Sequence, residues 1–163
     1  MSAQNNSDAP LRLIAHDQAD LEVMAACFQD AVLQVGDMGH MATMRRFALV
    51  ANRLRWERVH TGSETQTSAE RVRCGLHFDD VNQVHARRIR RDRPDEVLSL
   101  MTIRFEPDTT NAPGGFVTLV FAGGGEVRLK VDALSAACAD LSGPWPARGL
   151  PGHDAPETSG HQE

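Results

Sequence analysis

The sequence predicts an α+β fold: a mostly antiparallel sheet of about seven strands, with one early helix and one C-terminal helix. Apolar periodicity places the elements in the order strand, helix, about six strands, helix. Regular alternation of strand and helix stops after residue 31, which disfavours a doubly wound parallel sheet. Short turns join the consecutive strands, and such connections favour an antiparallel meander.

The expected domain covers residues 10–146, between a disordered tail at 1–9 and a flexible tail at 147–163. Its first strand is LRLIAH at 11–16. Asp17 follows as a helix N-cap, because a carboxylate there accepts hydrogen bonds from the first free backbone amides. A helix at 18–29 carries apolar residues at spacings of three and four, the pattern of one buried face. These residues are Leu21, Met24, Ala25 and Phe28.

The segment that follows has the period of strands. Residues 31–35 are compatible with a strand, and the glycines after them mark a bend. Residues 44–56 form a long strand in which the apolar residues alternate between two faces. Phe47, Leu49 and Ala51 fall on one face, with Ala48 and Val50 on the other. Asn52 interrupts this alternation, which predicts a bulge or a bend. Residues 59–69 are polar and form a loop.

Five further strands are expected after this loop, the last two of them in a hairpin. The strand at 71–78 has its apolar residues on one face, namely Val72, Cys74, Leu76 and Phe78. An ambiguous strand runs from Val81 toward Ile89. Residues 97–105 are apolar on both faces, which is typical of a central strand. Beyond a turn-rich loop at 106–115, residues 116–131 form a hairpin, because three consecutive glycines allow the positive φ of a tight turn.

The last element is expected to be a helix capped by Asp132. Four residues lie at i, i+3, i+4 and i+7, and Gly143 with Pro144 ends the helix. The four are Leu134, Ala137, Cys138 and Leu141. By analogy of element order, a meander ending in such a helix resembles a pleckstrin-homology-like, partly open barrel. A flat antiparallel sheet packed by two helices is the competing arrangement.

Composition indicates a soluble, cytoplasmic protein. The apolar fraction is 41% and the charged fraction is 24%, both close to globular averages. The three cysteines are far apart and odd in number, which favours reduced thiols. We expect no signal peptide, because residues 1–10 are polar, and no membrane span, because no long apolar run is present.

The charge is distributed unevenly along the chain. The net charge is −5, yet residues 45–93 hold twelve arginines against six acids. One basic run reads HARRIRRDR at 85–93, and a second group of arginines lies on the preceding long strand. Guanidinium groups bind phosphates and carboxylates, so the two groups would together form an anion-binding surface if their segments are neighbours in the sheet. The alternative is that the acids of the same fold neutralise them.

Sequence motifs of catalysis and cofactor binding are missing. The three glycines lack the GxGxxG spacing and the helix that a phosphate cradle needs. The chain contains no CxxC, no HExxH and no GxSxG, so no cofactor or metal is expected. A small enzyme around His77, Asp79 and Asp80, or around Cys74, is kept as an alternative. Cys74 has the spacing of a core residue, which favours a structural role.

Several segments resemble an uncharacterised bacterial family found mainly in alphaproteobacteria. They are RLIAHDQADL, QDAVLQVGDM, RRFALVANRLRWE, VLSLMTIRFEP and VTLVFAGGGEVRLKVD. The resemblance covers residues 10–146 and implies a shared fold and host class. Because the family has no established function, the resemblance transfers no catalytic residue. Most hallmark residues of this family are apolar, turn-forming or arginine, and the exceptions are Asn52, Trp56 and Glu57. These three would form either a structural cluster or part of a binding site.

Our leading hypothesis is a non-catalytic binding or assembly module, with a homodimer as one possibility and no membrane association. Its partner is an unknown protein or nucleic acid with negative charge. Nucleic-acid binding through the same basic surface is the alternative function. The contact residues that we expect are Arg46, Asn52, Arg53, Arg55, Trp56, Arg88, Arg90 and Arg91. Ligand identity does not follow from these residues.

Overall fold

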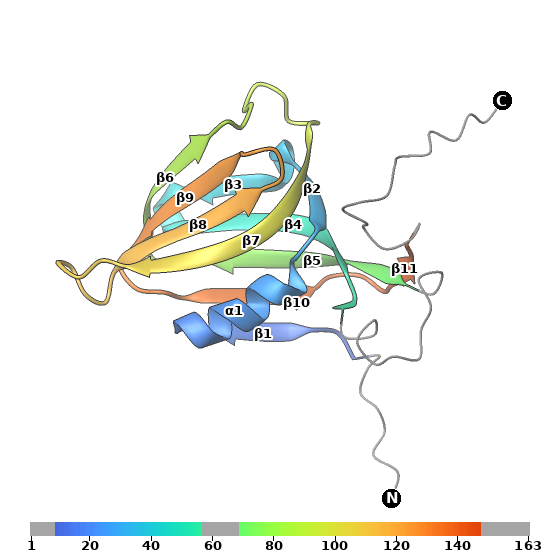
Figure 1. The fold of residues 1–163 in the computed structure, drawn as a ribbon, viewed down its shortest axis with the longest axis horizontal. Helices are drawn as coiled ribbons and strands as arrows, with labels where there is room; N and C mark the ends of the chain where they lie inside the picture. Colours follow the sequence, from blue (N-terminus) through green and yellow to red (C-terminus); the bar gives the residue numbers. More distant parts are fainter. Residues whose placement is uncertain (1–8, 57–68, 148–163) are drawn as a thin grey trace, which may run out of the picture.

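A computed structural model of the chain describes residues 9–56 and 69–147 (Figure 1). The elements are β1 (Arg12–Ala15), α1 (Gln18–Cys27), β2 (Ala31–Gln34), β3 (Met38–Met41), β4 (Arg46–Leu54), β5 (Glu70–Phe78), β6 (Val81–Arg87), β7 (Val97–Pro107), β8 (Gly115–Phe121), β9 (Glu126–Val131), β10 (Ala136–Asp140) and β11 (Trp145–Pro146). Short 3₁₀ turns at Val35–Asp37 and Ala42–Met44 flank β3.

All eleven strands belong to one antiparallel sheet that curls back on itself. Nine of them follow the order β1-β10-β5-β4-β2-β7-β8-β9-β6, while β3 pairs with β4 and β11 pairs with β5. The curl returns β6 to the beginning of β4, where the Val81 amide donates to the Arg45 carbonyl over 2.9 Å. The mostly antiparallel α+β class is therefore confirmed, in the form of an open and strongly curled sheet.

The early helix is present and begins at the predicted cap. The Asp17 carboxylate accepts a hydrogen bond from the Asp20 amide over 2.8 Å. Leu21, Met24 and Phe28 are buried, as the apolar spacing predicts. The helix packs against β1 and β7, strands from opposite halves of the sheet order (Figure 1). One face of α1 thus closes the core against the concave side of the sheet.

The central strands follow the predicted alternation, with one exception in β7. Val72, Cys74, Leu76 and Phe78 of β5 are all buried. β7 lies between β2 and β8, an interior position. Its pairing with β8 shifts register between Leu100 and Thr102, and this irregularity turns both Leu100 and Ile103 inward. The pattern that reads as apolar on both faces comes partly from this shift.

The β8–β9 hairpin forms as predicted. Val117 pairs with Leu129 and Leu119 with Val127, all buried. Gly123 and Gly124 adopt φ values of 88° and 95°, which a side chain rarely tolerates. The glycines therefore allow the tight turn between β8 and β9, as the hairpin interpretation predicts.

The predicted C-terminal helix is wrong, because its residues form β10. Leu134, Ala136 and Cys138 are buried at a spacing of two, and Leu141 is 59% exposed. Leu134 and Cys138 fit both the helical spacing and this strand spacing, so apolar periodicity alone did not distinguish a helix from a strand here. Pairing with both β1 and β5 supplies hydrogen bonds on both sides of the strand. Tertiary pairing thus outweighs the helix propensity of the alanines, and the barrel analogy loses its final helix.

The strand count also exceeds the prediction. The additional strands β3, β10 and β11 have four, five and two residues, too few for a clear alternation. The expected tails at 1–9 and 147–163 and the loop at 59–69 lie almost entirely outside the described residues. No helix in the described ranges has the length and apolarity needed to cross a bilayer.

Candidate functional site: two classes of arginine

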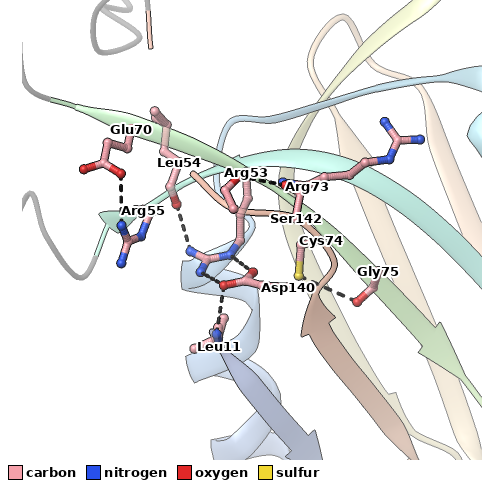
Figure 2. Close-up of polar contacts among 11 residues, drawn as sticks. Leu11, Arg53, Leu54, Arg55, Glu70, Arg73, Cys74, Gly75, Asp140 and Ser142 are labelled. Carbon is pink, nitrogen blue, oxygen red and sulfur yellow. Dashed lines mark hydrogen bonds and ion pairs between the residues drawn. The ribbon is translucent and has the colours of Figure 1, made fainter. Parts of the chain in front are cut away.

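Arg53 is one of the most buried side chains among the described residues, with no exposed surface. Its Nε and Nη2 donate to the two carboxylate oxygens of Asp140, each over 2.9 Å. Its Nη1 donates to the Leu54 carbonyl, and the Leu11 amide donates to Asp140 over 2.8 Å. Figure 2 shows Asp140 between Arg53 and Leu11, with Cys74 alongside. This bidentate pair is a structural tie between β4, β10 and the segment leading into β1.

The ionic form of Asp140 is favoured by its partners. Burial alone raises the pKa of a carboxyl group, but hydrogen bonds from Arg53 and from the Leu11 amide outweigh it and lower the pKa of Asp140. Because the pKa is lower in the folded state, the stability that Asp140 contributes is present above its unfolded pKa of about 3.9. It is lost as the pH falls through the folded pKa.

This linkage predicts a difference between pH profiles. The wild-type chain is expected to lose more unfolding free energy than Asp140→Asn when the pH is lowered from 7 to below about 4. Two exposed carboxyls with lowered pKa values, Asp108 and Asp132, contribute to both profiles and cancel in the comparison. Urea titrations at a series of pH values measure the two slopes. Parallel profiles would contradict the assignment of this acid sensitivity to Asp140.

The remaining arginines around β4 are also paired within the fold. Arg46 Nε donates to Asp79 over 2.7 Å, and Arg55 Nη1 donates to Glu70 over 3.0 Å. Arg45 pairs with Asp132. The side chain of Arg55 is only 5% exposed. Arg53 and Arg55 therefore face the interior, and the long strand offers no run of exposed guanidinium groups.

The two other residues predicted on this strand make internal contacts. Asn52 introduces no bulge, since β4 and β5 pair in continuous register from Phe47 to Leu54. The inward positions continue past Ala51 to Arg53, which occupies the place of an apolar residue. The Asn52 carbonyl accepts from Arg71 over 3.0 Å, and Trp56 Nε1 donates to the Gln29 carbonyl over 3.0 Å. Trp56 thus ties the end of β4 to the segment after α1.

The second basic run has the opposite character. It forms the loop between β6 and β7, and the name arginine loop is used below for residues 88–93. Its four guanidinium groups belong to exposed residues, Arg88, Arg90, Arg91 and Arg93. Within the described part of the chain, none of the four has an ion-pair partner. Residues 88–93 carry one acid, Asp92, and so have a net charge of +3, while Asp95 and Glu96 follow before β7 begins, so the whole β6–β7 connection has a net charge of +1.

The condition for a joint surface of the two basic groups, that their strands are neighbours in the sheet, is not met. The sheet order separates β4 from β6, and the two strands approach each other only near Arg45 and Val81. The sequence did contain a signal for the difference. Arg53 and Arg55 continue the odd-numbered positions of Phe47, Leu49 and Ala51, which are the inward positions of the strand.

The residues of the enzyme alternative are divided between two faces of the sheet. His77 Nδ1 lies 3.5 Å from Asp79 Oδ2, and Asp79 is already bonded to Arg46. Cys74 is fully buried on the inner face. A hydrogen bond with the Cys138 thiol, together with burial, raises the pKa of the Cys74 thiol, which opposes thiolate formation. Asp80 lies in the β5–β6 turn with φ of 58°.

A cavity of about 530 Å³ lies over β1, β10, β5 and β4. His77 and Arg46 line it together with small residues such as Ala48, Gly75 and Ala137. Cys74 does not line this cavity. No group of three or more His, Cys, Asp or Glu side chains suited to a metal ion occurs in the described ranges.

Comparison with known proteins identifies a family for this architecture. No curated protein and no solved structure matches the chain. A family model described as "Protein of unknown function (DUF2948)" matches residues 11–153. The match includes β1, whose preceding amide bonds to Asp140, as well as the arginine loop and β10. The chain therefore belongs to the DUF2948 family.

Proposed function

We propose that this protein is a non-catalytic binding module that holds an acidic partner protein through its arginine loop. The observation that carries the proposal is the division of the arginines. Those around β4 are neutralised by carboxylates of the fold, whereas Arg88, Arg90, Arg91 and Arg93 are exposed without such partners in the described residues. Unpaired guanidinium groups attract and orient carboxylates or phosphates.

The aromatic residues favour a protein over a single-stranded nucleic acid. Nucleic-acid binders of that kind stack bases on exposed aromatic rings. Phe116 on β8 is covered by the Arg128 guanidinium, whose Cζ lies 4.0 Å from the ring centroid. Among the Phe, Tyr and Trp residues of the described ranges, the exposed one is Trp145, on β11, which pairs with β5 and not with the strands beside the loop. The exposed rings beside the described arginine loop are therefore the imidazoles of His40 and His85, and not the larger rings of Phe, Tyr or Trp.

Two labelled probes test the proposal. A polyglutamate peptide and a single-stranded RNA of matched charge are titrated with the full chain, and binding is followed by fluorescence anisotropy. We expect the peptide to bind and the triple variant R88Q/R90Q/R91Q to lose at least tenfold in affinity, about 1.4 kcal/mol. A second triple variant, R12Q/R73Q/R104Q, removes the same charge from exposed arginines elsewhere and is expected to retain wild-type affinity.

Three results would change this assignment. Equal losses in both triple variants would mean that net charge, and not the arginine loop, governs binding. Binding of neither probe would reject the proposal. Tighter binding of RNA, with an affinity that falls steeply with salt, would make nucleic acid the partner instead.

A further inference from the structure

A cavity of about 370 Å³ opens between β3 and β6, beside the arginine loop. Buried Phe47 and Val127 form its floor, and partly buried side chains form its walls. The wall residues are Met38, Val84, Ala86 and Ile89. This cavity is called the β3–β6 slit below. An apolar cavity of about 150 Å³ already holds a benzene ring, so the slit has room for a large apolar side chain.

Two strand edges border the slit, and within residues 9–56 and 69–147 neither has a neighbouring strand on that side. In these ranges β3 pairs with β4 and β6 pairs with β9. The slit is closed at one end by the bond from Val81 to Arg45, and at the other by the bond from the Gly36 amide to the Pro94 carbonyl over 2.8 Å. Among the described residues, no backbone bond joins β3 to β6 between these ends. Free strand edges bind extended peptides by adding main-chain hydrogen bonds.

Charge at the mouth of the slit selects the partner. Arg91 lines the slit itself, and Arg90 and Arg93 neighbour it in the arginine loop. His40 also lines the slit, opposite Phe47 in the β3–β4 register, and is exposed. An apolar interior with Arg91 in its lining complements a peptide that alternates between apolar and acidic residues, since successive side chains of an extended chain point in opposite directions.

We infer that the β3–β6 slit receives a large apolar side chain of an extended acidic segment in the partner protein. The backbone of this segment pairs with a free strand edge, and its carboxylates meet the arginine loop. The inference rests on the proposed function, because it adds an apolar anchor and a conformation to the acidic partner proposed there. Free edges, an apolar cavity and unpaired arginines meet at this one place.

Two labelled peptides of equal charge test the inference. One is eight glutamates with phenylalanine in place of the fourth residue, and the other has glycine at that position. Burial of a phenylalanine side chain stabilises by about 1.5–3 kcal/mol, so the phenylalanine peptide is expected to bind about ten- to a hundredfold more tightly. Ala86→Trp fills the slit and is expected to abolish this preference. His85→Trp adds the same side chain at the neighbouring exposed position and is expected to preserve it.

Hydrogen exchange provides a measurement that does not depend on how well the Ala86→Trp variant folds. The phenylalanine peptide is expected to slow exchange of amides in β3 or β6 of the wild-type chain. If both peptides bind equally and only R88Q/R90Q/R91Q weakens them, the slit is not the site while the proposed function stands. If neither peptide binds, both proposals fail. A phenylalanine preference that persists in a folded Ala86→Trp variant would place the anchor elsewhere and overturn the inference.

Discussion

Asp140→Asn is expected to lower the free energy of unfolding by about 3–5 kcal/mol, the range for removing one member of a buried ion pair. Arg53 has no exposed surface, and two of its three terminal nitrogens donate to the Asp140 carboxylate. Asparagine retains an acceptor oxygen but removes the negative charge that both of these nitrogens contact, so the buried guanidinium loses its bidentate carboxylate. Urea denaturation at pH 7, followed by circular dichroism, measures the loss.

A double variant separates the unpaired charge from the lost contacts. Arg53→Met with Asp140→Leu removes both ions, and such apolar replacements of buried pairs are often neutral or stabilising. We expect the free energy of unfolding of the double variant to exceed that of Asp140→Asn by about 1–2 kcal/mol or more. Glu126→Gln alters an exposed pair with Arg87 at 3.5 Å and is expected to change stability by less than about 1 kcal/mol. A double variant as unstable as the single one would contradict the role assigned to charge.

Phe28→Ala is expected to destabilise the protein by about 3–5 kcal/mol, the cost of truncating a buried aromatic residue. Phe28 is fully buried at the C-terminal cap of α1, and its amide donates to the carbonyls of Met24 and Ala25. Truncation leaves a cavity between the helix and the sheet, which the helix cannot fill without breaking its contacts with β1 and β7. Thermal and urea denaturation are the appropriate measurements.

The matched control lies on the same helix. Val23 is 57% exposed, so Val23→Ala removes apolar atoms that solvent already reaches. Its effect is expected to remain within about 0.5 kcal/mol, as for most surface substitutions. Comparable losses in the two variants would show that helix formation, and not burial of the Phe28 ring, determines how α1 contributes to stability.

Local patterns predicted most of the fold where a single period governs a segment. Asp17 caps α1, and alternation identifies β5 and the β8–β9 hairpin. Prediction failed at β10, because Leu134 and Cys138 fit both a helical and a strand spacing. Hydrogen bonds to β1 and β5 decide that this segment is a strand, and they form only when the sheet assembles. Rules based on local sequence do not include these long-range bonds.

The candidate site was less accessible from the sequence than the fold. The partners of the paired arginines are distant in sequence: Arg46 and Asp79 are 33 positions apart, and Arg53 and Asp140 are 87 positions apart. The alternation of β4 predicts that Arg53 points inward, but it does not identify Asp140 as the carboxylate that neutralises it. The β3–β6 slit arises where the curl of the sheet brings β6, the last strand of the sheet order, beside β3 and the start of β4. Strand order and curl decide this feature, and apolar periodicity carries no information about either.

The place of β10 in the sheet determines when the fold can be completed during synthesis. This strand lies between β1 and β5, both of which leave the ribosome much earlier. Until residues 136–140 emerge, β1 lacks β10, the strand with which it pairs, and Arg53 lacks its bidentate partner Asp140. Non-local strand pairing of this kind slows folding and exposes unpaired edges in the interval. The nascent chain therefore depends on its final strands to convert a set of hairpins into a closed core.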